Sequence, residues 1–199
     1  MPGIGARLRD SVGGIPRPQW LRVVMNRRTE QFVNSLKTES LDALEISGDR
    51  WKNVSFRSYQ SIDFAGYDLC AGPLATAKWD IIFLEQVLEH VLSPAKALRN
   101  IYEMLRPGGI LVNTTPFLIR IHEHPRDCSR WTETGIRHLL ADNGFPLENI
   151  QTGSWGNKAC LVANLGKQWP TYLPLLHSLK NDPRYPVVVW AFARKGEQR

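Results

Sequence analysis

The chain has 199 residues, 43% of them hydrophobic, which is enough to bury a substantial core in one large domain. Its longest apolar run, VVVWAFA at 187–193, is far shorter than the roughly 20 residues that a membrane-spanning helix needs, so we expect a cytoplasmic protein with no membrane span. Cys70, Cys128 and Cys160 form no CxxC pair, which argues against a zinc cluster and a disulfide framework.

The formal net charge of +6 is concentrated near the start of the chain. Residues 1–40 carry seven Lys or Arg and three acidic residues, an excess of four positive charges. The basic residues are not interleaved with aromatic ones, as they would be on a surface that stacks single-stranded bases. A nucleic-acid partner is therefore not expected, and a solvated helix face explains the charge.

The first 40 residues are predicted to form a leader and one helix. Residues 1–16 are rich in glycine, and residues 19–36 place apolar side chains at helical spacing, which predicts an amphipathic helix. The apolar positions are Leu21, Val24, Met25, Phe32 and Leu36. This helix could act as a lid over a pocket, or it could pack as a flank with its basic face in solvent.

Residues 41–199 alternate between strand and helix patterns. Strands are predicted at 42–46, 55–63, 79–84, 110–117, near 149–155 and at 185–195, and helices at 93–105 and 132–145. Ser93 is a candidate N-cap, Pro94 suits the first helical turn, and the RPGG sequence at 106–109 ends that helix. The alternation predicts an α/β fold, a Rossmann-like doubly wound and mostly parallel sheet that binds ligands at the carboxyl ends of its strands.

The sequence ALEISGDRW at 43–51 ends a predicted strand in a loop with a single glycine. Gly48 allows both a sharp turn and a close approach of the backbone to a ligand. Asp63 ends the next predicted strand 18 residues after Glu45, close to the separation between a nucleotide-binding loop and the acid that binds the ribose hydroxyls. Taken alone, Asp63 could equally be an exposed turn residue.

The middle of the chain resembles the class I S-adenosylmethionine-dependent methyltransferases, of the small-molecule, type 11-like subgroup. The resemblance lies in a strand introduced by Trp79 and Asp80, the sequence VLEHV at 87–91, and a helix followed by LRPGG at 105–109. The later sequence HEHPRDCSRWTETGIRHLLADNGF is also similar to this subgroup. The resemblance covers residues 41–194 and implies a C-terminal β-hairpin that inserts an antiparallel strand into the sheet.

The resemblance implies S-adenosylmethionine as the cofactor. Glu45 would lie near its amino-acid end, Gly48 would leave room for its methionine half, and Asp63 would bind its ribose. Asp68 and Leu69 would flank the adenine, and Glu85 with Gln86 would line the mouth of the pocket. The chain departs from the family in this first loop, which usually carries two or three spaced glycines.

The implied reaction is an in-line attack of a nucleophile on the sulfonium methyl group, so the protein has to align the partners and accept a proton. His122 and His124 are the candidate bases, because an unperturbed imidazole titrates near neutral pH. His90, Arg130 and Trp131 are candidates for substrate binding, although His90 could be structural and Trp131 could anchor the core. No metal is expected, because the loop with His122, His124 and Asp127 has no second cluster of ligands.

The function expected from the sequence is methyl transfer to a small molecule, with oxygen as the slightly preferred acceptor and a sugar or secondary metabolite as the substrate class. The alternative is a non-catalytic binding or partner subunit with weakened cofactor affinity. A nicotinamide-dependent oxidoreductase is disfavoured, because no GxGxxG follows the first strand. Residues 155–185 are predicted to be an insertion that could carry substrate contacts or a homodimer surface.

Overall fold

The computed structural model describes residues 11–12, 15–63, 66–123 and 125–197. Its strands are β1 (Ser11–Val12), β2 (Ile15–Pro16), β3 (Asp42–Ile46), β4 (Ser58–Ile62), β5 (Trp79–Glu85), β6 (Leu105–Pro116), β7 (Ile150–Trp155) and β8 (Val188–Arg194). Its helices are α2 (Arg22–Asn34), α3 (Pro94–Met104), α4 (Glu133–Ala141) and α5 (Lys158–Asn164), with 3-10 turns η1 (Thr38–Ser40), η2 (Leu88–His90) and η3 (Leu147–Asn149).

Six strands form the central sheet in the order β4-β3-β5-β6-β8-β7. The pairs β4–β3, β3–β5 and β5–β6 are parallel, whereas β8 runs antiparallel to both of its neighbours. This arrangement confirms the predicted Rossmann-like fold with an antiparallel C-terminal strand. The chain order reverses between β3 and β5, and in such open sheets this reversal creates a crevice at the carboxyl ends of the two strands.

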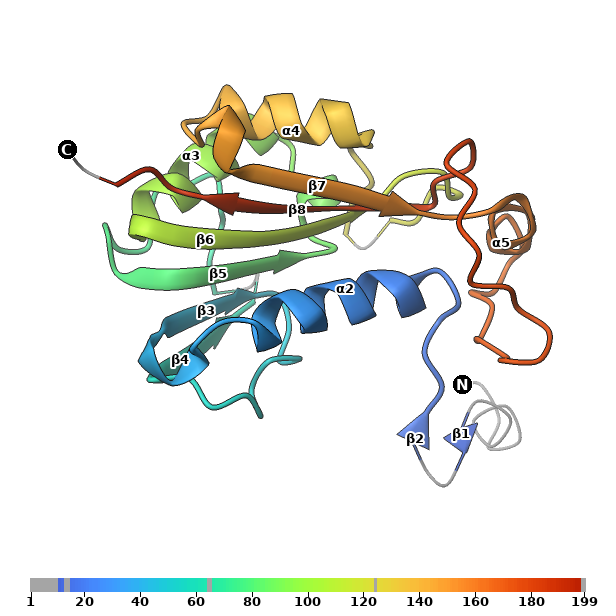
Figure 1. Cartoon of the computed structure of the whole chain (residues 1–199). Helices are drawn as coiled ribbons and strands as arrows, with labels where there is room; N and C mark the ends of the chain where they lie inside the picture. The colour runs from blue at the N-terminus through green and yellow to red at the C-terminus, as the bar shows by residue number, and fades with distance from the viewer. Residues whose placement is uncertain (1–10, 13–14, 64–65, 124, 198–199) are drawn as a thin grey trace.

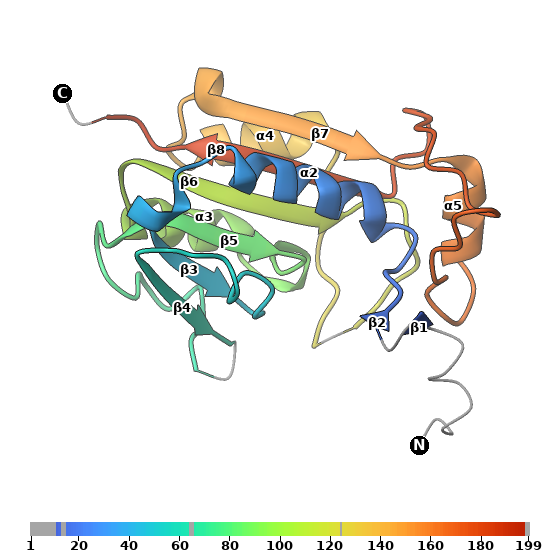
Figure 2. The same ribbon diagram turned by 60° about the horizontal axis from the view of Figure 1, so that its bottom comes forward.

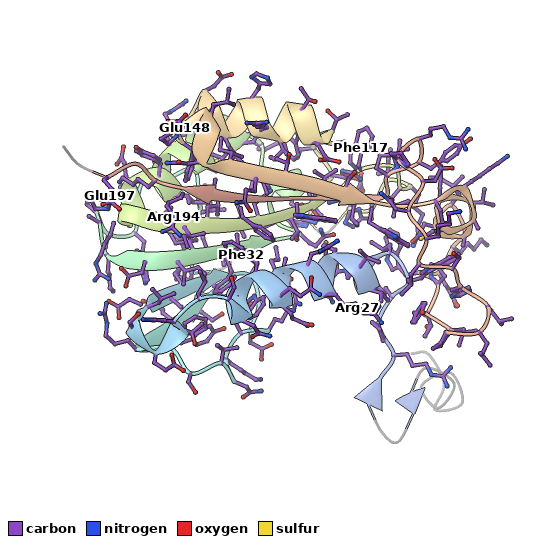
Figure 3. All side chains as sticks on the ribbon, in the orientation of Figure 1. Arg27, Phe32, Phe117, Glu148, Arg194 and Glu197 are labelled. Atoms are coloured by element: carbon purple, nitrogen blue, oxygen red, sulfur yellow. The ribbon has the colours of Figure 1, made fainter. Side chains whose placement is uncertain are left out.

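Helices cover both faces of the sheet (Figures 1 and 2). On one face α3 packs against β6, and α4 packs against β7 and β8; on the other face α2 packs against β7 and β8. Figure 3 shows Phe32 on α2 directed toward the sheet, where its ring stacks on Phe192 at 4.1 Å, while Arg27 on the same helix is exposed. The sheet is thus buried on both sides, as its continuous apolar strands indicate.

The connection between β3 and β4 contains turns where a doubly wound fold usually has a helix. It spans residues 47–57 and places Trp51 on the sheet face that α2 also covers. The Trp51 ring is 3% exposed and stacks on Phe83 of β5 at 4.7 Å between ring centroids. One indole therefore buries part of the sheet that a crossover helix would otherwise cover.

Most sequence-based elements are confirmed within a few residues, with three differences. The helix α2 buries Val23 and Val33 in addition to the predicted Met25, while the predicted Val24, Phe32 and Leu36 pack partly buried against the core, so its apolar face is wider than predicted. Pro94 opens α3, but the Ser93 side chain makes no capping hydrogen bond. The strand β6 begins at Leu105 rather than residue 110, because a register shift against β5 takes the RPGG residues into the strand.

Residues 155–185, the predicted insertion, contain α5, which lies beyond the carboxyl end of β7 (Figure 1). This segment packs on the residues that precede α2. The Trp20 backbone N–H donates to Pro170 at 2.8 Å, and the Trp20 ring stacks on His177 at 4.0 Å. No helix within the described ranges has the length and apolar character that crossing a bilayer requires.

Candidate functional site

A cavity of about 380 Å³ lies at the carboxyl ends of β3 and β5, where the strand order reverses. Its volume falls in the range of about 300 to 1,000 Å³ that is typical of small-molecule sites. Four loops contribute to its wall. The lining residues are Ile46, Ser47, Tyr67, Asp68, Leu69, Cys70, Gln86, Val87, His90, Val91, Leu92, Ser93, Pro125 and Arg126.

Both strands at the cavity end in a residue with a left-handed backbone. Ser47 follows β3 with φ of 60°, and Gln86 follows β5 with φ of 57°. Backbone hydrogen bonds hold both turns: the Ser47 N–H donates to Ile62 at 2.9 Å, and the Gln86 N–H donates to Thr114 at 2.8 Å. Such a conformation costs energy for a residue other than glycine and is enriched at functional sites.

The loop after β4 brings two predicted cofactor residues to the cavity. Leu69 is 4% exposed and supplies an apolar wall, and Asp68 stands beside it on the rim. The Asp68 Oδ1 atom accepts a hydrogen bond from the Cys70 N–H at 2.8 Å, which closes a local turn and leaves Oδ2 for a ligand donor. Together with Val87 and Val91 across the cavity, these residues provide apolar walls and a polar edge suited to a purine.

The carboxylate of Glu45 is engaged by the loop that follows its own strand. Its Oε1 atom accepts from the Arg50 N–H at 3.0 Å, and its Oε2 atom accepts from the Trp51 N–H at 3.0 Å and the Tyr59 hydroxyl at 2.6 Å. A Cβ atom at Gly48 would lie 2.6 Å from Glu45 Oε1. Neither Glu45 nor Gly48 is among the residues that line the cavity. The close contact with Glu45 accounts for a glycine at position 48 without a bound ligand.

Glu85 is enclosed on the same face of the sheet. Its Oε1 atom accepts from Arg50 Nη1 at 2.7 Å, and its Oε2 atom accepts from Trp51 Nε1 at 2.8 Å. Burial raises the pKa of Glu85, while the Arg50 guanidinium acts in the opposite direction. Arg50 also bonds to Glu30 of α2, so this ion-pair network ties the first loop to the helix. Of the two residues predicted at the pocket mouth, only Gln86 lines the cavity.

Asp63 lies directly after β4, next to the end of β3, and is exposed. Its backbone carbonyl accepts from the Gly66 and Tyr67 N–H groups at 2.9 and 3.1 Å, which starts the turn toward Asp68. The residue is not among the cavity lining, although Tyr67 of the same turn is. Its assignment to the ribose stays a prediction.

The histidines predicted to be catalytic belong to the loop after β6. His122 is half-buried, and burial lowers its pKa, so the imidazole is neutral at pH 7. Its ring lies 5.0 Å from that of His90, which lines the cavity, whereas His122 is not among the lining residues. His124 lies outside the described residues.

The side chains of Arg130 and Trp131 both contact other residues of the protein: Arg130 forms an ion pair, and Trp131 packs against the core. Both Nη atoms of Arg130 donate to the Asp127 carboxylate, with Nη2 and Oδ2 at 2.6 Å. That guanidinium holds the pKa of Asp127 below its usual value although burial opposes it. Trp131 packs against the core cluster that contains Leu98 and Ile136, and Thr132 caps α4 by accepting from Gly135 N–H at 3.0 Å. A role of Arg130 or Trp131 in substrate binding stays a prediction.

The least expected residue of this region is Glu89, which sequence reasoning left out of the candidate site. Its side chain is 0% exposed, and neither carboxylate oxygen has a hydrogen-bond partner among the described residues. Burial raises its pKa to about 7. An acid within the apolar sequence VLEHV was the available signal. Arg126 lines the cavity and was also not predicted as a site residue. It follows the predicted bases in the sequence, and nothing in the surrounding pattern marks it as functional.

The wall of the cavity fits S-adenosylmethionine. Leu69, Val87 and Val91 would hold the adenine, and Asp68 would accept from a polar edge of the adenosine half. Ile46, Ser47 and Gln86, at the strand ends, would then face the methionine half. The first loop contributes Ser47 to this end of the cavity. Its Arg50 and Trp51 are bonded to the carboxylates of Glu45 on β3 and Glu85 on β5, neither of which lines the cavity.

Comparison with known proteins gives one family match. Residues 13–150 match the family model described as a methyltransferase domain. No curated protein sequence matches the chain significantly.

Solved structures with the same fold are numerous. An S-adenosylmethionine-dependent methyltransferase of Mesorhizobium loti is 15% identical with a TM-score of 0.54, over 83% of this chain and 96% of its own. A Thermotoga maritima methyltransferase, named as a possible histamine N-methyltransferase, is 13% identical with a TM-score of 0.57, over 88% and 98%. The [4+2]-cyclase SpnF is 14% identical with a TM-score of 0.57, over 87% and 81%. At these identities the likeness establishes the fold.

Proposed function

The chain belongs to the methyltransferase-domain family, whose cofactor is S-adenosylmethionine, and on that basis we propose that it transfers the cofactor's methyl group to a hydroxyl of a small molecule. The observation that carries the proposal is the cavity at the carboxyl ends of β3 and β5. It lies at the reversal of strand order, where open α/β sheets bind ligands, and it combines apolar walls with a few polar groups.

In this proposal the residues of the cavity align the cofactor and exclude water. S-Adenosylmethionine supplies an activated methyl group, so the protein mainly has to place the acceptor in line with the carbon–sulfur bond. Leu69 and Val87 would fix the adenine, and Asp63 the ribose. Ser47 and Gln86, held by backbone hydrogen bonds to neighbouring strands, would fix the position of the methionine half.

The acceptor side is assigned to the region of His90 and His122. An oxygen nucleophile has to lose its proton during the reaction, whereas the cofactor sulfur leaves with the electron pair and needs none. The neutral imidazole of His122 and the buried carboxyl of Glu89 can bind or accept such a proton. These groups support a hydroxyl as the acceptor, and the substrate class that we propose is a small molecule such as a sugar or a secondary metabolite.

Isothermal titration calorimetry with S-adenosylmethionine and S-adenosylhomocysteine tests the cofactor half of the proposal. The matched variants are Leu92→Glu, at the cavity, and Leu175→Glu, remote from it; the two leucines are 67% and 99% exposed, so neither change disturbs the core. Losing the apolar contact of Leu92 and partly desolvating the new carboxylate cost about 1 to 2 kcal/mol, so Leu92→Glu should bind S-adenosylhomocysteine, which lacks the sulfonium charge, roughly 5- to 30-fold more weakly. Leu175→Glu should bind like the wild type.

Binding of neither ligand at millimolar concentration, by a folded protein, would reject the enzyme and favour a non-catalytic binding or partner subunit. Equal affinities of the two leucine variants would reject the cavity as the cofactor site.

A further inference from the structure

Three side chains from two loops meet beside the cavity. Glu89 and His90 belong to η2, directly after β5, and His122 belongs to the loop after β6. Each offers one ligand atom, and these atoms all lie within 4.8 Å of one another. Two imidazole nitrogens and one carboxylate oxygen form a common donor set for divalent first-row transition metals.

The buried carboxylate of Glu89, whose oxygens have no partner among the described residues, points to a ligand at this cluster. Buried polar groups nearly always have partners, yet both Glu89 oxygens lack a hydrogen-bond donor among the described residues. The backbone N–H of Glu89 itself, Arg130 and Arg22 lie near enough to lower the pKa of the carboxyl, but none of them forms a hydrogen bond of normal geometry to it. Arg130 is instead engaged by Asp127. The lone pairs of Glu89 therefore remain available to a ligand inside the protein.

The two histidines are prepared as ligands. His90 Nδ1 is hydrogen-bonded to the backbone carbonyl of Arg126, which fixes the tautomer with a free lone pair on Nε2. His90 Nε2 lies 3.6 Å from Glu89 Oε1. His122 Nδ1 is buried without a hydrogen-bond partner among the described residues, and its distance to Asp127 Oδ2 is 3.7 Å. A carbonyl hydrogen-bonded behind the ring, as at His90, is the usual support of a metal-binding histidine, and at His122 the Asp127 carboxylate lies nearby without a hydrogen bond.

We propose that Glu89, His90 and His122 bind one divalent first-row transition-metal ion, of the Zn²⁺ or Mn²⁺ class, at the edge of the cavity. Three protein ligands leave a coordination position open, and His90 lines the cavity, so that position can receive an oxygen of the acceptor. This second part rests on the proposed function. With the ion bound, His122 and Glu89 act as its ligands, and this role replaces the proton-accepting role that the metal-free site would give them.

The ion would explain how a hydroxyl becomes a nucleophile at neutral pH. Coordination lowers the pKa of the hydroxyl, whose proton passes to water. The oxygen then forms a bond to the methyl carbon while the carbon–sulfur bond breaks, and the sulfur keeps the electron pair as a neutral thioether. The expected acceptors are therefore small molecules with a coordinating hydroxyl.

Metal binding can be measured without the cofactor. The full chain, freed of metal with a chelator, is titrated with Zn²⁺ by calorimetry and with Co²⁺ by visible absorption. The test variants are Glu89→Gln and His122→Ala, and the control is His138→Ala, which removes an exposed histidine of α4. We expect one ion per chain, at least tenfold weaker binding in both test variants, and unchanged binding in the control.

The absence of stoichiometric Zn²⁺ and Co²⁺ binding at millimolar metal would overturn the proposal. So would a dissociation constant that stays the same in both test variants, which would indicate adventitious surface binding. Should Glu89→Gln fail to fold, His122→Ala decides, because that residue is only half-buried. S-Adenosylmethionine titrations on the same metal-free protein keep the two proposals separate: retained cofactor binding without metal binding rejects only the ion.

Discussion

Replacing Glu45 by Gln should destabilise the whole protein, because its carboxylate holds the loop between β3 and β4. The side chain is 4% exposed and accepts three hydrogen bonds, from two backbone N–H groups and the Tyr59 hydroxyl. A glutamine keeps one acceptor oxygen. If that oxygen stays with Trp51 and Tyr59, the new amide group faces the Arg50 N–H, and two donors oppose each other.

The magnitude follows from these contacts. Losing one hydrogen bond to a charged group, with its donor left buried, costs about 1.5 to 3 kcal/mol. The two remaining bonds also weaken, because a neutral oxygen replaces a charged one. We therefore expect a loss of about 2 to 3 kcal/mol in the free energy of unfolding. For a chain of this length each kcal/mol lowers Tm by about 2 to 4 °C, so Tm should fall by roughly 4 to 12 °C.

Urea unfolding followed by circular dichroism measures this change, with Glu39→Gln as an exposed control. Tyr59→Phe removes a single bond and should cost about half as much as Glu45→Gln. Gly48→Ala should also destabilise, by about 1 to 3 kcal/mol, because its Cβ would lie 2.6 Å from Glu45 Oε1. A Glu45→Gln protein within about 0.5 kcal/mol of the wild type, the usual range for a surface change, would refute the reasoning.

Two further predictions concern carboxylates at opposite ends of the sheet. Asp63→Ala should weaken S-adenosylmethionine binding by roughly 1.5 to 3 kcal/mol, the loss of a charged hydrogen bond, while the exposed Asp142→Ala should not; equal calorimetric affinities would remove Asp63 from the ribose site. Hydrogen bonds from Arg57, Ser58 and Arg106 hold the pKa of Asp42 well below its usual 3.8. The contribution of Asp42 to the free energy of unfolding is therefore complete above about pH 4 and declines as the pH falls further. Urea unfolding measures this: between pH 5 and pH 3 the free energy of unfolding should fall less for Asp42→Asn than for the wild type.

The regular elements could be predicted because their signals are local. The pattern DALEI gave β3 its observed bounds, and the apolar run of β5 indicated a strand covered on both faces. The helix predicted from residue 132 is observed with Thr132 as its N-cap. Periodicity and capping depend on residues within one turn or strand, so a single sequence carries them. The family match agrees with the resemblance carried by VLEHV and LRPGG.

The surroundings of the first loop could not be predicted. The single glycine of ALEISGDRW suggested a weakened cofactor motif, whereas in the structure Gly48 packs against Glu45, and Trp51 covers the sheet in place of a helix. Nothing near Arg50 in the sequence indicates that it pairs with Glu85, which lies 35 residues away. Such pairs depend on the order of strands and on which face each side chain occupies.

The α/β class, the strands buried on both faces and the carboxyl edge of the sheet, where the cavity lies, were predictable because composition and periodicity act over short stretches. Which loops meet at that edge depends on the order of the strands. Glu89 and His122 are separated by 33 positions and come together because β5 and β6 are parallel neighbours whose carboxyl ends share one edge. In the proposed metal site, the ligands that the histidine loop lacks in the sequence come from the loop of the adjacent strand.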